Sequence, residues 1–170
     1  MLYMLLAVSH WVGGIVTIFE FIIARVTRRA PDFVIGKPEA PYLLRWWVIP
    51  RNRFFNVYLH CFMRSDDDRA LHDHPWSNLS ILLRGRYVEH TIAAGGINVR
   101  TERIAPTWKI RPSGAAAHRI ELVDGCCWTI FVTGPRYRDW GFHCPERGWV
   151  HWKDFTDTSN SGEIGKGCEQ

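Results

Sequence analysis

The sequence predicts an all-β domain, built as a sandwich or a small barrel, and three observations lead to this. From residue 43 onward, short runs rich in β-branched and aromatic residues alternate with turn residues. No amphipathic helix of more than two turns interrupts them. The chain of 170 residues fits one domain, and 46% hydrophobic with 14% aromatic residues is enough for a packed core. Short strands at this spacing are typical of all-β folds.

The N-terminal residues 1–29 are predicted to form an apolar helix. Residues 2–24 are an apolar run about as long as a membrane span, interrupted by His10 and Glu20 and followed by "RVTRR". Arginines on that side would keep the rest of the chain in the cytoplasm. A membrane anchor, a peripheral helix and an extension that packs on the domain all fit this composition.

Residues 30–42 follow this helix and contain three prolines and a glycine, so we expect a linker or an extended lead-in to the first strand there. The β domain is then expected to span residues 43–156. Residues 157–170 are rich in glycine, serine and charged residues, and we expect them to form a flexible tail.

The individual strands follow from runs of apolar, aromatic and β-branched residues. Clusters of Gly, Pro, Asp and Ser separate these runs, as expected of turns. The predicted strands are residues 43–49, 54–64, 78–91, 97–104, 107–112, 117–123, 127–134, 139–144 and 149–155.

Two histidines, His72 and His74, stand one residue apart before a predicted strand. In extended chain, side chains at i and i+2 share a face, so both rings point the same way and Asp73 points to the other side, as a turn or surface acid. Two neutral imidazoles from one segment and a third from a facing strand make three sides of a metal site with open positions.

The stretch "HDHPWSNLSILLRG" resembles the first motif of the cupin superfamily, which reads H-x-H, three or four residues, Glu, six residues, Gly. Its spacing to Gly85 fits if Asn78 stands in the glutamate's place. Further on, "RPSGAAAHRIEL" resembles the second motif, P-x-G-x-x-H, through Pro112, Gly114 and His118, with the histidine one residue late.

The resemblance implies a single cupin-like β-barrel, or jelly-roll sandwich, that pairs into a homodimer. It implies one divalent metal ion held by His72, His74 and His118, with Asn78 as a candidate neutral ligand. The superfamily's thiol dioxygenases have a three-histidine site of this kind, which favours Fe(II), while Zn, Mn and Ni also suit imidazole-rich sites.

Three further residues are candidate substrate-binding groups. Arg53 enters a predicted strand and can clamp a carboxylate or phosphate. His60 alternates with its strand neighbours and either lines the pocket or is a hydrogen-bonded sheet histidine. Tyr87 is a candidate proton donor. Of Glu89 and His90 on the same predicted strand, only one can face inward, and we expect both to be solvated.

Charge and cysteine content exclude some classes of protein. The formal net charge is +4, but much of the excess lies in residues 25–29, and no basic stripe suggests nucleic-acid binding. The five cysteines, Cys61, Cys126, Cys127, Cys144 and Cys168, are an odd number without C-x-x-C spacing. We therefore expect free thiols in a reducing compartment.

Three functions fit these observations. The first is a metal-dependent enzyme, of the Fe(II) dioxygenase type, that acts on a small polar molecule. The second is a metal-free isomerase or epimerase that uses histidine as acid and base. The third is a non-catalytic module that binds a small ligand.

Overall fold

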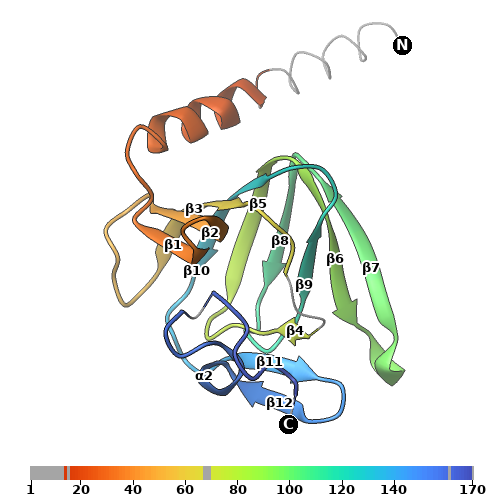
Figure 1. Cartoon of the computed structure of the whole chain (residues 1–170). Coiled ribbons are helices and arrows are strands. Elements are labelled where there is room, and N and C mark those ends of the chain that lie inside the picture. Colours follow the sequence, from red (N-terminus) through yellow and green to blue (C-terminus); the bar gives the residue numbers. More distant parts are fainter. Residues whose placement is uncertain (1–13, 15, 67–69, 161, 170) are drawn as a thin grey trace, which may run out of the picture.

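The computed structural model describes residues 14, 16–66, 70–160 and 162–169. The described chain is mostly β-structure in antiparallel sheets, as predicted, arranged as two facing layers with a helix outside one of them (Figure 1). Within these residues the sheets form an open sandwich and do not close into the predicted barrel.

The strands are short and follow one another with tight connections. They are β1 (Phe33–Lys37), β2 (Ala40–Trp47), β3 (Asn56–Phe62), β4 (Leu71–His72), β5 (Asn78–Arg84), β6 (Arg86–Ile92), β7 (Asn98–Ile104), β8 (Thr107–Arg111), β9 (Arg119–Leu122), β10 (Cys127–Thr133), β11 (Gly141–Cys144) and β12 (Gly148–His151). The short helices are η1 (Ala94–Gly96) and α2 (Trp152–Phe155), so the last predicted strand, residues 149–155, is part strand and part helix.

One layer is a six-stranded sheet with the order β1-β2-β3-β10-β5-β8. The other contains two three-stranded sheets, β12-β11-β4 and β7-β6-β9. An isolated antiparallel bridge between His72 and His118 joins these two sheets, because each residue donates its N–H to the other's carbonyl at 2.9 Å. The second layer is therefore continuous across the two histidines.

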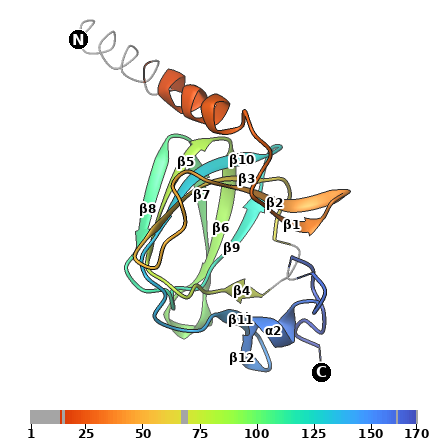
Figure 2. The same cartoon turned by 90° about the vertical axis from the view of Figure 1, so that its left-hand side faces the viewer.

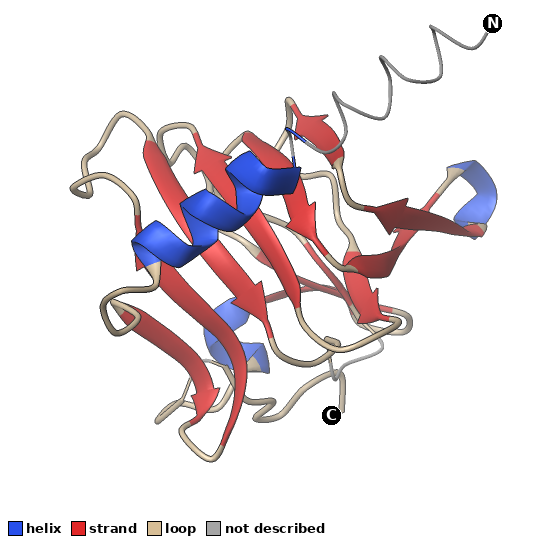
Figure 3. Cartoon of the chain, turned by 90° about the horizontal axis from the view of Figure 1, so that it is seen from above, coloured by secondary structure: helices blue, strands red, loops and turns tan. Residues whose placement is uncertain are grey.

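The outer face of the six-stranded sheet is covered by the N-terminal helix, whose described part includes residues 16–26 (Figure 3). Ile23 is 5% exposed and packs in one cluster with Trp46 and Leu59 of the sheet. No helix among the described residues is both long and apolar enough to cross a membrane. Most of the span predicted for residues 2–24 lies outside the described residues.

The linker predicted for residues 30–42 is wrong, because this segment contains β1 and the start of β2. Pro38 lies in the turn between the two strands, and Pro41 pairs with Gly36 of the edge strand β1, before the pairing with β3 begins at Leu43. Prolines at an edge and in a turn remove no hydrogen bond from the centre of the sheet.

The flexible tail predicted for residues 157–170 is also wrong in its described part, which packs beside α2 and β11 (Figure 2). Ile164 forms a bridge with Thr156, and Glu163 forms an ion pair with Arg64 at 3.0 Å. Cys168 forms a disulfide bond with Cys144, so the expectation of five free thiols is wrong as well. The other three cysteines are free.

The packing of the helix predicts a position-dependent effect on stability. Ile23→Ala removes a buried side chain and should lower the free energy of unfolding by about 2–5 kcal/mol in urea denaturation. Ile18→Ala is the control on the same helix, because Ile18 is 57% exposed and should change it by less than about 0.5 kcal/mol. Equal effects at the two positions would contradict this packing.

The disulfide bond closes a loop with a sequence separation of 24. Changing Cys144 and Cys168 together to serine should lower the free energy of unfolding by about 3 kcal/mol, because the unfolded chain gains freedom. Cys126→Ser, at a free and half-buried cysteine, is the matched control. An unchanged denaturation midpoint in the double variant would show that the bond does not form.

Candidate metal centre

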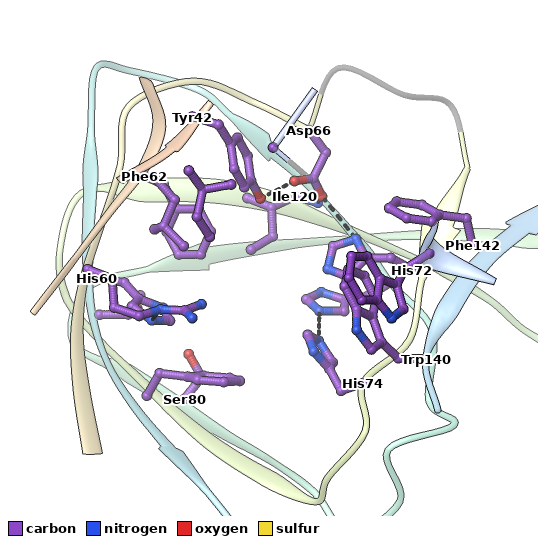
Figure 4. A pocket seen from close by; sticks show the side chains of 18 of the residues that line it. Tyr42, His60, Phe62, Asp66, His72, His74, Ser80, Ile120, Trp140 and Phe142 are labelled. Atoms are coloured by element: carbon purple, nitrogen blue, oxygen red, sulfur yellow. Dashed lines mark hydrogen bonds and ion pairs between the residues drawn. The ribbon is translucent and has the colours of Figure 1, made fainter. Parts of the chain in front are cut away.

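A cavity of about 340 Å³ lies inside the sandwich. Side chains from both layers and from the C-terminal segment line it, and it lies within the size range of small-molecule sites. Histidines stand at two of its sides, with His60 on the six-stranded sheet and His72 and His74 across from it (Figure 4).

Three imidazoles gather at one side of this cavity, those of His72, His74 and His118. The backbone explains why they meet. His72 and His118 are paired directly across the bridge, and cross-strand partners point their side chains to the same face. His74 lies two residues beyond His72 and shares its face. One nitrogen of each ring lies within 4.8 Å of the others, as the H-x-H spacing and the second motif predicted.

Carboxylates face the Nδ1 atoms of two of these rings. Glu89 Oε1 lies 3.2 Å from Nδ1 of His118, and Asp66 Oδ2 lies 3.7 Å from Nδ1 of His72. Asp66 is itself fixed, because its Oδ2 accepts the N–H of Ile120 at 2.6 Å and its Oδ1 accepts the hydroxyl of Tyr42. Neither pair is a hydrogen bond by geometry, since Nδ1 of His118 has no such partner among the described residues and the Asp66 contact is 3.7 Å long. A negative charge beside Nδ1 favours the proton on that nitrogen, which leaves the lone pair on Nε2.

Glu89 is the buried acid with the most cationic partners. Its side chain is 3% exposed and accepts hydrogen bonds from Lys109, Arg111 and Arg103. Burial alone would raise the pKa of Glu89, but the adjacent His118 ring and the nearby cations Lys109 and Arg111 together lower it well below its ordinary value. Burial lowers the pKa of Lys109 to about 8, an effect that Arg111 strengthens and Glu89 partly offsets.

The three rings fit a divalent metal ion in charge, and the rings of His74 and His118 also fit it in spacing. Burial is the main cause that lowers the pKa of His72, His74 and His118, so the rings are neutral, as ligands must be. Nε2 of His74 lies 2.9 Å from Nε2 of His118. Two nitrogens bound at a right angle, each about 2.1 Å from one ion, are about 3.0 Å apart.

The motif glycines have structural roles at this site. A Cβ on Gly114 would lie 2.3 Å from the carbonyl oxygen of His74, and the N–H of His74 donates to the carbonyl of Gly114 at 2.8 Å. Gly85 has φ +93° and joins β5 to β6, where a Cβ would lie 2.8 Å from the carbonyl oxygen of Cys126. Any larger residue at position 114 would displace His74.

The structure places only some of the other predicted site residues at the cavity. His60 and Tyr87 both line the cavity. Arg53 does not line it: this residue is exposed and lies over the ring of Phe54, at 4.9 Å from its centroid. Asn78 is buried, shares a face of β5 with Ser80, and its side-chain amide has no partner among the described residues. Its role as a ligand stays a prediction.

Two acids are placed differently from what the sequence suggested. Asp73 is fully buried, forms an ion pair with Arg138 at 2.9 Å and accepts the N–H of Gly141 at 2.8 Å, so it is not a surface acid. Glu89 and its neighbour His90 are both buried, not solvated, and His90 pairs with Glu121 on β9 at 2.7 Å. In the sequence, only the alternation of side chains along this strand suggested that Glu89 could face inward. Alternation alone could not decide whether Glu89 or His90 does so.

No family model matches the sequence, and no curated protein matches it. Solved structures with a similar fold include Fe(II)-HppE with an alternative substrate, at 11% identity and a TM-score of 0.48, over 62% of this chain and 58% of that one. A cupin superfamily protein from Desulfitobacterium hafniense DCB-2 matches at 13% identity and 0.43, over 55% and 77% of the two chains. A putative mannose-6-phosphate isomerase from Ralstonia eutropha JMP134 matches at 13% and 0.47, over 61% and 92%.

The second of these structures is described as a cupin superfamily protein. The histidine cluster at residues 72, 74 and 118 fits the resemblance seen in the sequence. The chain spans about three fifths of the length of HppE. Because the identities are low and the TM-scores are below 0.5, we argue the function from the chain's own residues.

The environment of Glu89 predicts a strong effect of its charge. Glu89→Gln leaves buried cations without their carboxylate and should lower the free energy of unfolding at pH 7 by about 3–5 kcal/mol. The ordinary pKa of a glutamate is 4.5, and the folded pKa of Glu89 is lower, so its stabilisation is present above about pH 4.5 and is lost as the pH falls toward the folded pKa.

Urea denaturation between pH 3 and pH 7 measures both effects, and the variant should show a flatter dependence on pH below about 4.5. Glu102→Gln is the control, because the Glu102 side chain is 51% exposed and lies 3.6 Å from Arg86. A parallel pH profile in wild type and Glu89→Gln would contradict the assignment.

Proposed function

We propose that this protein binds one divalent metal ion through His72, His74 and His118 and acts as a metal-dependent enzyme on a small molecule in the adjoining cavity. Iron(II) is the favoured ion and a dioxygenase-type oxidation the favoured reaction. The observation that carries the proposal is the gathering of three neutral imidazoles at the cavity wall, two of them with a carboxylate at Nδ1.

The chain's residues supply the ligands and an apolar surrounding. The carboxylates of Asp66 and Glu89 lie beside two of the rings and favour an orientation with Nδ1 toward the acid. Phe131, Phe142 and Trp140 line the cavity beside the histidines. An ion held by three histidines keeps open positions for reactants, and with iron it supplies oxygen activation.

A metal-free isomerase or epimerase is the alternative. The histidine–carboxylate pairs His118–Glu89 and His72–Asp66 support it, because such pairs also occur in acid–base catalysis. The short contact between His74 and His118 would then be a hydrogen bond. Burial disfavours the charged forms of all three rings, and this weakens them as general acids. A non-catalytic binding module would show ligand binding without turnover.

Metal content tests the proposal directly. We expect close to one equivalent of a divalent ion in the full-length protein purified without oxygen, and less than a tenth of that in His74→Ala, measured by elemental analysis. His143→Ala is the matched control, because His143 is not part of the cluster and its side chain is 42% exposed. Circular dichroism establishes that the variants fold.

The choice among the three functions follows from the same samples. Iron bound by the wild type and lost from His74→Ala supports the oxidising enzyme, and oxygen uptake with small thiols and acids then tests turnover. No binding of Fe(II), Zn, Mn or Ni after reconstitution, or equal binding by wild type and His74→Ala, would overturn the metal proposal. The homodimer, the membrane attachment and the cytoplasmic location stay predictions.

A further inference from the structure

A polar row crosses the inner face of the six-stranded sheet, facing the cavity. Arg45 on β2 pairs with His60 on β3, and His60 pairs with Thr129 on β10, so their side chains stand side by side. All three line the cavity. Figure 4 shows His60 across the cavity from His72 and His74, so this row is separate from the histidine cluster.

Arg45 is held in one position by its neighbours. Its Nε donates to Nε2 of His60 at 2.8 Å, and its guanidinium lies over the ring of Tyr58, 4.9 Å from the centroid. His60 is 3% exposed and stacks on Phe131, so the acceptor is itself fixed. With Nε occupied, the two terminal nitrogens of Arg45 form the end of the guanidinium that can bind two oxygens of one anion.

Arg45 has no carboxylate partner among the described residues, whereas the other cations of the cavity have one. Arg64 pairs with Glu163, and Lys109 and Arg111 both bind Glu89. Guanidinium stays charged in proteins, and because Arg45 is only partly exposed, leaving its charge without a counter-ion has a cost. This cost is removed if a ligand brings the missing negative charge.

The charged residues that line the cavity have a net positive charge, as Arg45 itself does. Among the described lining residues, four side chains are basic, Arg45, Arg64, Lys109 and Arg111, and two are acidic, Asp66 and Glu163. Glu89 adds one negative charge behind the wall and Arg103 adds one positive charge beside it. The cavity therefore has a surplus of positive charge even before a metal ion with neutral ligands is added.

A second polar group of the row also lacks a partner. Thr129 is 1% exposed, lines the cavity, and its hydroxyl makes no hydrogen bond to the described residues. Buried hydroxyl groups are normally hydrogen-bonded, so an unpaired one at a cavity wall indicates a site where a ligand or water binds. Thr129 lies on the far side of His60 from Arg45, on the same inner face of the sheet.

We propose that Arg45, with Thr129 further along the same row, binds an oxyanion group, carboxylate or phosphate, of the small molecule that occupies this cavity. The rest of that molecule extends toward His72, His74 and His118. His60 is a positioning residue, because it holds Arg45 and carries no charge of its own. The proposal rests on the proposed function for the identity of the reacting end, but the anion site itself does not require a metal ion.

Paired probes that differ in charge test the site in the full-length protein. Propionate is compared with propionamide, and glycerol 3-phosphate with glycerol, by NMR titration of metal-free and metal-loaded protein. We expect at least one acid to bind about tenfold or more tightly than its neutral partner in the metal-free protein, and which acid it is distinguishes carboxylate from phosphate. Arg45→Gln should weaken that acid by about ten- to a hundredfold and leave the neutral partner unchanged.

Two further variants keep the test sharp. Arg45→Lys retains the positive charge but loses the paired N–H donors of the guanidinium, so it should bind the acid more tightly than Arg45→Gln and more weakly than the wild type. Thr129→Val keeps the shape of the side chain but loses the hydroxyl, and should weaken binding of the acid several-fold. Arg53→Gln is the matched control outside the cavity and should change nothing. Thermal unfolding of each variant verifies that the fold is intact.

The outcomes separate this proposal from the metal proposal. Equal binding of acids and neutral partners, or a preference that survives Arg45→Gln, would overturn the anion site. A preference seen only in metal-loaded protein and independent of Arg45 would overturn it too, because the ion would then be the anion's partner. An Arg45-dependent preference in a protein that binds no metal would support the anion site and overturn the metal function.

Discussion

The backbone pair between His72 and His118 is the contact on which the second layer and the candidate site both depend. Its two hydrogen bonds of 2.9 Å join the sheet of β4 to the sheet of β9, which otherwise share no bridge among the described residues. The same pairing points both imidazoles to one face. The fold and the cluster therefore form together, and a chain that lost the pair would lose the convergence of its histidines.

The six-stranded sheet has polar side chains at the cavity, so apolar contacts elsewhere must stabilise it. The inner face of the six-stranded sheet presents Arg45, His60 and Lys109 to a cavity, and beyond the cavity Leu82 and Cys127 pack with Tyr87 and Ile120 of the facing sheet. A separate apolar cluster lies on the outer face, where Leu59 is fully buried and packs with Ile23 of the N-terminal helix. The six-stranded sheet is therefore stabilised by apolar contacts on both faces, and the helix supplies those on the outside.

Local pattern predicted those features that depend on local spacing. Short strands, turns and the shared face of His72 and His74 follow from alternation, and the second motif located His118. What failed depends on contacts distant in sequence. Cys144 and Cys168 are separated by 24 residues, and no spacing rule pairs them. Arg45 stands in an aromatic run, and only the register of β2 against β3 places it in the cavity beside His60.

The charges of the site explain why an asparagine can stand where the cupin motif has a glutamate. Three neutral imidazoles leave a divalent ion with its full charge, and the cations of the cavity oppose its binding. A ligand anion that neutralises Arg45 reduces that repulsion, so the anion favours the ion. Thermodynamic linkage requires the ion to favour the anion by the same factor. A glutamate ligand would weaken this coupling, because it would neutralise the ion without the substrate. With the proposed metal site, a neutral ligand set would couple binding of the ion to binding of the anion.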